Sequence, residues 1–317
     1  EASGLAQDKA AEELLLSDFP PQMRKTYRKA LLAHRLRREI VGTVVANRIV
    51  NRMGMVHPFE LAEEAGAGLD RVACAFVSAC SLLEMDALWE AIEKARISEE
   101  ARLMLFGHVA HGLRSHMADL LRAGGCGEAP SRLKAELGPV IAELSEHTDK
   151  LLGTEARAHV AAISGELIDA GAPPKLAQAV GRLFAQDGAF GLAMLARDSG
   201  IAPVELAAGF VELGSLLGLD WAQSRASVMS PSDPWERLLV AGLARDFQQM
   251  RLEFLGQLAA NRGKNGDLKA QIGRWAKDNH ASVATFRSAI ARAQGSAPTT
   301  PAALAQIASQ ARNMLKR

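Results

Sequence analysis

The chain has 317 residues, of which 48% are hydrophobic and 23% are charged, and its formal net charge is +1. This length can bury a sizeable core in one large or two ordinary domains, and the composition is that of a soluble globular protein. The sequence contains neither a signal peptide nor an apolar run long enough to cross a bilayer, which excludes a membrane-spanning chain and favours the cytoplasm.

The most informative stretch is residues 19–54, which we expect to form one long basic helix, either straight or bent near His34. Asp18 is placed to cap this helix, and the prolines that follow suit its first turn. Gly54 is a natural stop. Apolar residues recur at every fourth position and predict a buried row of Leu32, Leu36, Ile40 and Val44. The basic residues of the stretch are Arg24, Lys25, Arg28, Lys29, Arg35, Arg37, Arg38, Arg48 and Arg52, against the single acidic residue Glu39.

Part of this helix is a candidate docking face. Asn47 and Asn51 continue the apolar row, and a buried amide is costly unless it is paired. They therefore indicate a specific partner surface or a register-setting hydrogen bond. The basic residues fit a docking role, but they also fit an ordinary solvated surface. The candidate docking face comprises Arg35, Arg37, Arg38, Glu39, Asn47, Asn51 and Arg52.

The three cysteines are Cys74, Cys80 and Cys126, an odd number without metal-ligand spacing. Cys74 and Cys80 lie in an apolar helical run, where they are expected to be small core residues. Cysteines used in this way are typical of a reducing cytosol.

Residues 58–83 have the spacing of a helix-turn-helix, with Gly66 and Gly68 in the turn. The second helix offers only Arg71 for contacts with base edges, so we interpret it as a core helix. Ten residues recur at an offset of 134 positions, which indicates an internal duplication. Leu61, Ala62, Gly66, Ala73, Phe76, Val77, Ser81, Leu82, Leu83 and Asp86 correspond to Leu195, Ala196, Gly200, Ala207, Phe210, Val211, Ser215, Leu216, Leu217 and Asp220.

A long helix is expected after each copy, capped by Ser98 in the first and by Ser232 in the second, where it runs to Gly263. The chain then ends in basic helices, and no segment has a convincing strand pattern. We therefore predict an all-α fold in which a long basic N-terminal helix precedes two related multi-helix subdomains. The expected segments are residues 1–56, 57–127, 128–263 and 264–317. Tryptophans at 89, 221, 235 and 275 are expected to be core anchors.

The sequence shows no active site. His108, His111 and His116 form its one histidine cluster. His108 and His111 can share a helix face, but a metal site needs a third ligand at the right geometry, and Arg114 beside them would repel a cation. The glycines at positions 124, 125 and 127 follow a helix, whereas a dinucleotide-binding loop follows a strand. We predict no catalytic, cofactor-binding or metal-binding residue in this chain.

The run HRLRREIVGTVVANRIVNRMG at residues 34–54, with FPPQM and Tyr27 before it, resembles a segment near the C-terminal end of the large NAD-specific glutamate dehydrogenases of bacteria. ELGSLLGLDW at residues 212–221 and the PWERLL region that follows look like a later part of the same tail. The resemblance implies that this chain is the terminal piece of a longer one. It also implies that the catalytic lysine and aspartate and the NAD-binding loop lie upstream, because no residue here matches them.

The family oxidises L-glutamate to 2-oxoglutarate and ammonia with hydride transfer to NAD. The resemblance therefore implies a non-catalytic structural, assembly or regulatory region, with NAD bound only by the parent enzyme. Its expected partners are the upstream catalytic domain and further copies of the parent in a homo-oligomer, without a membrane. The alternative is a helical nucleic-acid-binding or protein-interaction module that uses the basic ends of the chain.

Overall fold

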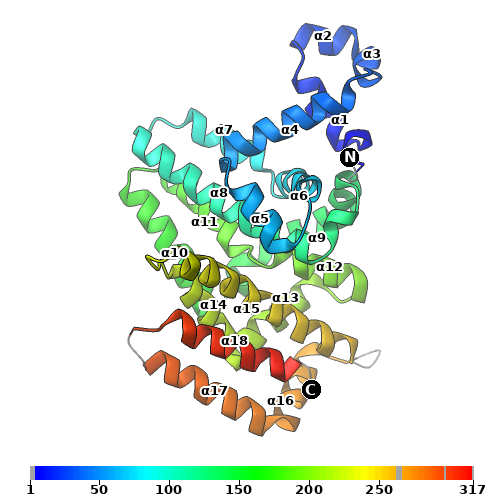
Figure 1. Cartoon of the computed structure of the whole chain (residues 1–317). Helices are drawn as coiled ribbons and strands as arrows, with labels where there is room; N and C mark the ends of the chain where they lie inside the picture. The colour runs from blue at the N-terminus through cyan, green and yellow to red at the C-terminus, as the bar shows by residue number, and fades with distance from the viewer. Residues whose placement is uncertain (1–3, 262–265, 296–297, 316–317) are drawn as a thin grey trace. The chain divides into compact units, whose positions relative to one another are not determined.

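The computed structural model describes residues 4–261, 266–295 and 298–315 (Figure 1). Every regular element in these ranges is a helix, which confirms the all-α prediction. The chain packs as two units. Unit 1 contains the residues up to Ile141 together with Ile163–Leu183, and unit 2 contains Ala142–Ala162 together with the residues from Phe184 onward. The division into four sequence segments stays a prediction.

Unit 1 is built around the long helix α8, which packs against α4, α5, α6 and α7. Phe76 of α6 stacks on Trp89 of α7 with ring centroids 6.4 Å apart, and both side chains are fully buried. Its elements are η1 (Leu5–Gln7), α1 (Ala10–Ser17), α2 (Pro21–Thr26), α3 (Arg28–Leu32), α4 (Arg37–Met53), α5 (His57–Ala65), α6 (Leu69–Leu82), α7 (Met85–Lys94), α8 (Glu99–Arg122) and η2 (Gly125–Gly127).

Unit 2 is built around the long helix α15, which packs against α12, α13, α14, α16 and α18. Its own helices are α12 (Ala189–Ser199), α13 (Pro203–Leu217), α14 (Leu219–Val228), α15 (Pro234–Ala260), α16 (Leu268–Asp278), α17 (His280–Gly295) and α18 (Pro301–Leu315). Three further helices contribute residues to both units: α9 (Pro130–Leu151), α10 (Thr154–Asp169) and α11 (Pro174–Ala185).

The prediction of one continuous helix over residues 19–54 is wrong, because the structure has α2, α3 and α4 in this stretch. The backbone leaves the helical conformation at Tyr27 (φ −116°, ψ 22°) and again after α3. Asp18 ends α1, so it does not cap α2, which begins directly with Pro21. A proline pair so soon after α1 starts a new helix, because proline favours a first turn and cannot continue an earlier helix.

The buried row of α4 also differs from the prediction by one position. The buried residues are Val41, Val45, Ile49 and Met53. Leu36 of the predicted row is 44% exposed, and Asn47 and Asn51, which continue that row, are exposed. Both rows follow the same four-residue spacing, and packing against α1 and α8 turns the second one inward. Gly54 ends α4 with φ 81°, as predicted.

Several local predictions can be compared with the observed caps. The Ser98 side chain caps α8 by accepting a hydrogen bond from the Ala101 amide. Ser232 was expected to cap the second long helix, but Asp233 caps it and accepts from the amides of Trp235 and Glu236. A carboxylate one residue later is the stronger acceptor for the exposed amides. The predicted end of that helix at Gly263 lies outside the described residues.

The tryptophans were all expected in the core, and this is wrong for Trp235, whose side chain is 79% exposed at the start of α15. Trp89 is 1% exposed. Trp221 and Trp275 are partly exposed. A tryptophan in the first turn of a helix has few neighbours unless another element covers that end.

The helix boundaries repeat at the offset seen in the sequence. α6 and α13 begin at Leu69 and Pro203, and α7 and α14 begin at Met85 and Leu219, in each case 134 positions apart. Gly66 and Gly200 end their helices in the same left-handed conformation. These correspondences support the duplication, which itself stays a prediction.

In the described part of the chain, no single helix has the length and apolarity needed to cross a membrane. The pair α5 and α6 passes that test only together, with a bend of 109° between the two helices.

Candidate functional site

The candidate docking face lies around α4 in unit 1, and its members have different surroundings. Arg35, Arg38, Glu39, Asn47 and Asn51 are exposed. The asparagines lie on the side of α4 opposite the buried row, so their amides need no internal partner. Arg35 and Glu39 lie one helical turn apart in sequence, and no bond joins these two described side chains.

Arg37 is bound within the protein. Its Nε donates to the backbone carbonyl oxygen of Ala6 at 2.6 Å, and its Nη1 donates to that of Leu32 at 3.1 Å. The guanidinium thus joins the start of the chain to the end of α3 and the start of α4. Hydrogen bonds from a charged donor are stronger than neutral ones, so Arg37 has a structural role here.

Arg52 is also bound within unit 1. Its Cζ lies 4.8 Å from the ring centroid of Trp89 and 5.8 Å from that of Phe106. Its Nη1 donates to Oε1 of Glu93 at 2.7 Å. One turn earlier, Arg48 forms an ion pair with Asp86. These arginines attach α4 to α7 and lie at the edge of the core. Within the candidate face, Arg37 and Arg52 are therefore partly buried, whereas the other members are exposed.

The helix-turn-helix segment is not arranged to read DNA. α6, the second helix of that segment, buries most of its side chains, including Val72, Cys74, Phe76 and Cys80. A recognition helix must expose one face to the major groove, and α6 lacks such a face. The prediction of a core helix is confirmed, as is the core position of Cys74 and Cys80. Burial raises the pKa of the Cys80 thiol well above its ordinary value. The side chain of Cys126 lies outside the described residues.

The histidines do not converge on a common site. Nε2 of His108 lies 3.7 Å from Oε2 of Glu166, whereas the buried His116 has its Nε2 2.8 Å from the carbonyl oxygen of Leu183. Among the residues that the structure describes, no group of three or more histidine, cysteine, aspartate or glutamate side chains could hold a metal ion.

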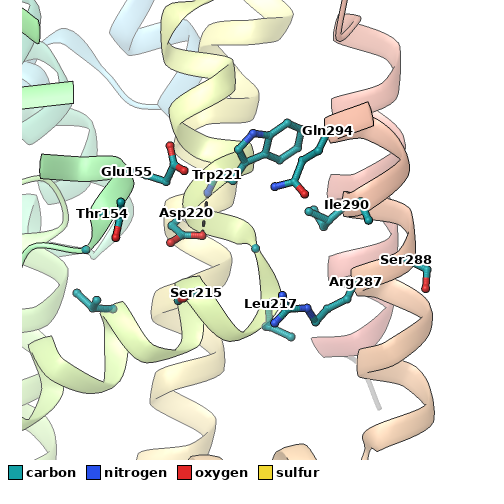
Figure 2. Close-up of a pocket in the computed structure, with 14 residues that line it drawn as sticks. Thr154, Glu155, Ser215, Leu217, Asp220, Trp221, Arg287, Ser288, Ile290 and Gln294 are labelled. Carbon is teal, nitrogen blue, oxygen red and sulfur yellow. Dashed lines mark hydrogen bonds between the residues drawn. The ribbon is translucent and has the colours of Figure 1, made fainter. Parts of the chain in front are cut away.

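Unit 2 contains a pocket of about 570 Å³ that the sequence analysis missed (Figure 2). Its walls come from the start of α10, the end of α13, the start of α14 and one side of α17. The polar lining residues are Thr154, Glu155, Ser215, Asp220, Arg287, Ser288 and Gln294, and the apolar ones include Val211, Leu217, Trp221 and Ile290. Because these positions span more than a hundred residues, no local pattern could have brought them together.

The charged groups of this pocket are partly used within the protein. Oδ1 of Asp220 accepts a hydrogen bond from the Trp221 amide at 2.8 Å, and Nη1 of Arg287 donates to the carbonyl oxygen of Leu216 at 3.0 Å. Glu155 lies on the opposite wall from α17 (Figure 2). The pocket lining includes serines but neither a histidine nor a cysteine, so these walls hold no serine–histidine or cysteine–histidine pair.

Comparisons with known proteins agree on one family. Residues 1–313 match the family model described as glutamate dehydrogenase, C-terminal. The NAD-specific glutamate dehydrogenase of Halomonas elongata is 27% identical over 276 residues, which cover 86% of this chain and 17% of the relative. The enzyme of the same name from Pseudomonas aeruginosa is 25% identical over 89% of this chain and 18% of its own length. The one from Mycobacterium tuberculosis is 23% identical over 94% of this chain and 18% of its own. The chain thus spans less than a fifth of the curated relatives that it matches, and none of these matches favours the nucleic-acid alternative.

Proposed function

This chain belongs to the glutamate dehydrogenase C-terminal family, and from that premise we propose that it is the non-catalytic helical region of an NAD-dependent glutamate dehydrogenase. The observation that carries the proposal is the family match over residues 1–313. The chain also covers only a small share of the length of its relatives, so most of a parent enzyme would lie outside it. In this proposal, NAD and L-glutamate bind elsewhere in the parent enzyme, where 2-oxoglutarate, ammonia and NADH are formed.

The role that we propose for the region is docking and assembly. Its exposed polar residues at the start and along the outer side of α4 form the surface that contacts the upstream part of the polypeptide: Arg35, Arg38, Glu39, Asn47 and Asn51. Arg37 and Arg52 support that surface from within, because their guanidinium groups are bonded to unit 1. The parent would function as a cytoplasmic homo-oligomer.

The first experiment measures glutamate-dependent reduction of NAD by this chain alone and by a longer polypeptide that contains the upstream region. Activity is expected only in the longer polypeptide. Activity of this chain alone would overturn the proposal, because it would require an active site within the helices described above.

A second experiment tests the docking surface in the longer polypeptide. The triple variant Arg35→Ala, Asn47→Ala, Asn51→Ala removes three exposed side chains and no internal bond, so its effect reports on contacts outside unit 1. Loss of assembly or altered kinetics is expected. Arg96→Ala is the matched control, because Arg96 is an exposed arginine of unit 1 outside this surface. If the triple variant behaves like the control, α4 is not the docking surface.

A further inference from the structure

The segment formed by residues 19–36, here named the arm, has almost no core of its own. It contains α2, which buries no residue, and α3, which buries only Leu31. These helices have six and five residues, and helices that short are unstable in water unless they pack on something else. Figure 1 shows α2 and α3 at one end of unit 1, beyond α1 and α4.

The shape of the arm is nevertheless fixed at its base. Arg24 donates from Nε to the carbonyl oxygen of Phe19 at 2.5 Å and from Nη2 to that of Ser17 at 2.9 Å. Arg37 joins the other end of the arm to Ala6, as described above. The ring centroids of Phe19 and His34 lie 6.3 Å apart, so the first residue of the arm contacts a residue near its other end. The arm is thus preorganised without being buried, which lowers the entropic cost of binding a partner.

The outer surface of the arm combines apolar and basic side chains. Met23, Tyr27 and Leu36 are 40%, 56% and 44% exposed. The exposed basic residues around them are Lys25, Arg28, Lys29 and Arg35. The arm contains five lysines and arginines and neither an aspartate nor a glutamate. One counter-charge comes from Glu12 of α1, whose Oε2 lies 3.4 Å from Nη2 of Arg28.

We infer that the arm binds an acidic protein surface with an apolar pocket, located in the part of the glutamate dehydrogenase polypeptide outside this chain, and that Tyr27 and Met23 fill the pocket. The inference rests on the proposed function. Charge complementarity requires an acidic partner, and an aromatic anchor within a charged rim is the usual composition of a protein interface. The sugar-phosphate backbone of a nucleic acid would pair with the lysines and arginines but would leave Met23 and Leu36 uncovered. In the relatives, more than four-fifths of the polypeptide lies outside the matched region.

The experiment compares amide hydrogen exchange of residues 19–36 in this chain alone and in the longer polypeptide. The arm is expected to exchange at least ~10-fold more slowly in the longer polypeptide, because bound backbone opens less often. The double variant Met23→Ala, Tyr27→Ala is expected to restore fast exchange in the longer polypeptide. Leu103→Ala is the matched control, because Leu103 is an apolar residue of α8 that is 64% exposed and lies outside the arm.

Carbodiimide cross-linking of the same samples identifies the partner, because it joins a lysine amine to a carboxylate in direct contact. Lys25 and Lys29 are expected to link to aspartates or glutamates upstream of this chain. Links to a second copy of the arm region, or protection of the arm by duplex DNA added to this chain alone, would overturn the inference. Equal exchange in the short and long polypeptides would overturn it as well.

Glutamate-dependent reduction of NAD, measured on the same longer polypeptide, separates the two claims. If the longer polypeptide is active but its arm exchanges as fast as in this chain alone, the proposed function stands and the inferred contact of the arm is refuted. An inactive wild-type polypeptide contradicts the proposed function whatever the exchange of the arm.

Discussion

The guanidinium Cζ of Arg251 lies 3.7 Å from the ring centroid of Phe210 in the core of unit 2. Nη2 of this arginine also donates to the carbonyl oxygen of Phe210 at 3.2 Å, and its Nη1 donates to Oε1 of Gln223 at 2.9 Å. Burial lowers the pKa of Arg251 to about 10, and the carboxylates of Asp220 and Asp187 oppose that shift. Arg251 is therefore a buried cation that is stabilised by an aromatic ring and by specific hydrogen-bond acceptors.

This arrangement requires a glycine at position 214. A Cβ added to Gly214 would lie 2.7 Å from Nη2 of Arg251, whose guanidinium is held by its acceptors. We expect Gly214→Ala to lower the free energy of unfolding by about 2 kcal/mol through overpacking. In an Arg251→Met background, Gly214→Ala should lower the free energy of unfolding by less, since the methionine side chain is flexible and is not held by hydrogen bonds. At the 134-residue offset, Arg251 corresponds to the uncharged Met117, and Gly214 corresponds to Cys80, which has a side chain.

Urea unfolding of the wild type, both single variants and the double variant measures this coupling. A coupling energy of at least about 1 kcal/mol is expected, because the two residues are in contact. Additive effects would show that the cost of the added Cβ does not depend on Arg251 and would contradict the prediction.

Glu84 is the one non-glycine residue with positive φ in the described ranges, at 52°. The corresponding residue at the 134-residue offset is Gly218, with φ 76°. The left-handed conformation strains a side chain with a Cβ, so Glu84→Gly should raise the free energy of unfolding by about 0.5–1 kcal/mol. Gly218→Ala should do the opposite, because its Cβ would also lie 3.0 Å from Cγ2 of Ile290. Thermal unfolding of the two variants checks both signs, and a destabilised Glu84→Gly protein would refute the strain argument.

Arg52 is predicted to stabilise unit 1 through the Trp89 ring and Glu93. Arg52→Ala should lower the free energy of unfolding by about 1–2 kcal/mol, because both the cation–π contact and the packing of the aliphatic stem are lost. Arg52→Lys should retain part of this, since an ammonium keeps the charge and loses the planar contact. Asn51→Ala is the matched control on the same turn of α4, with an expected change within about 0.5 kcal/mol. Equal stabilities of the Arg52→Ala and Asn51→Ala proteins would contradict the prediction.

Cys80 is predicted to be unreactive in the folded protein. Burial raises the pKa of its thiol above the ordinary 9.0, and nearby Arg48 only partly offsets this. Alkylation of Cys80 by iodoacetamide at pH 8.5 should be at least ~100-fold slower in the native protein than in urea, because the thiolate is the reactive form. The neutral thiol also contributes stability that is fully present below pH 9 and is lost as the pH rises toward the folded pKa. Peptide mass spectrometry measures labelling at this site, and rapid native labelling would show that α6 is open to solvent.

The comparison of sequence and structure around α4 shows where local patterns are sufficient. The helical class, the stop at Gly54, the cap at Ser98 and the core position of α6 all follow from interactions within a few residues, and each was predicted correctly. The break at Tyr27 was missed, and near His34 only a bend was expected where the structure has a second break. They are stabilised in part by Arg37, which reaches the carbonyl of Ala6 from 31 positions away. The pocket of unit 2 was missed for the same reason, since its walls come from four helices.

The sequence by itself determined the family, the all-helical class and the set of basic residues near the N-terminus. Only the tertiary structure decided how those basic residues are used. Arg37 and Arg38 are neighbours of the same type, yet Arg37 binds the carbonyls of Ala6 and Leu32 while Arg38 lies exposed. Likewise, the choice between two adjacent apolar rows of α4 came from packing against α1 and α8. Periodicity and capping act within one or two turns, whereas burial depends on which distant surface a helix meets.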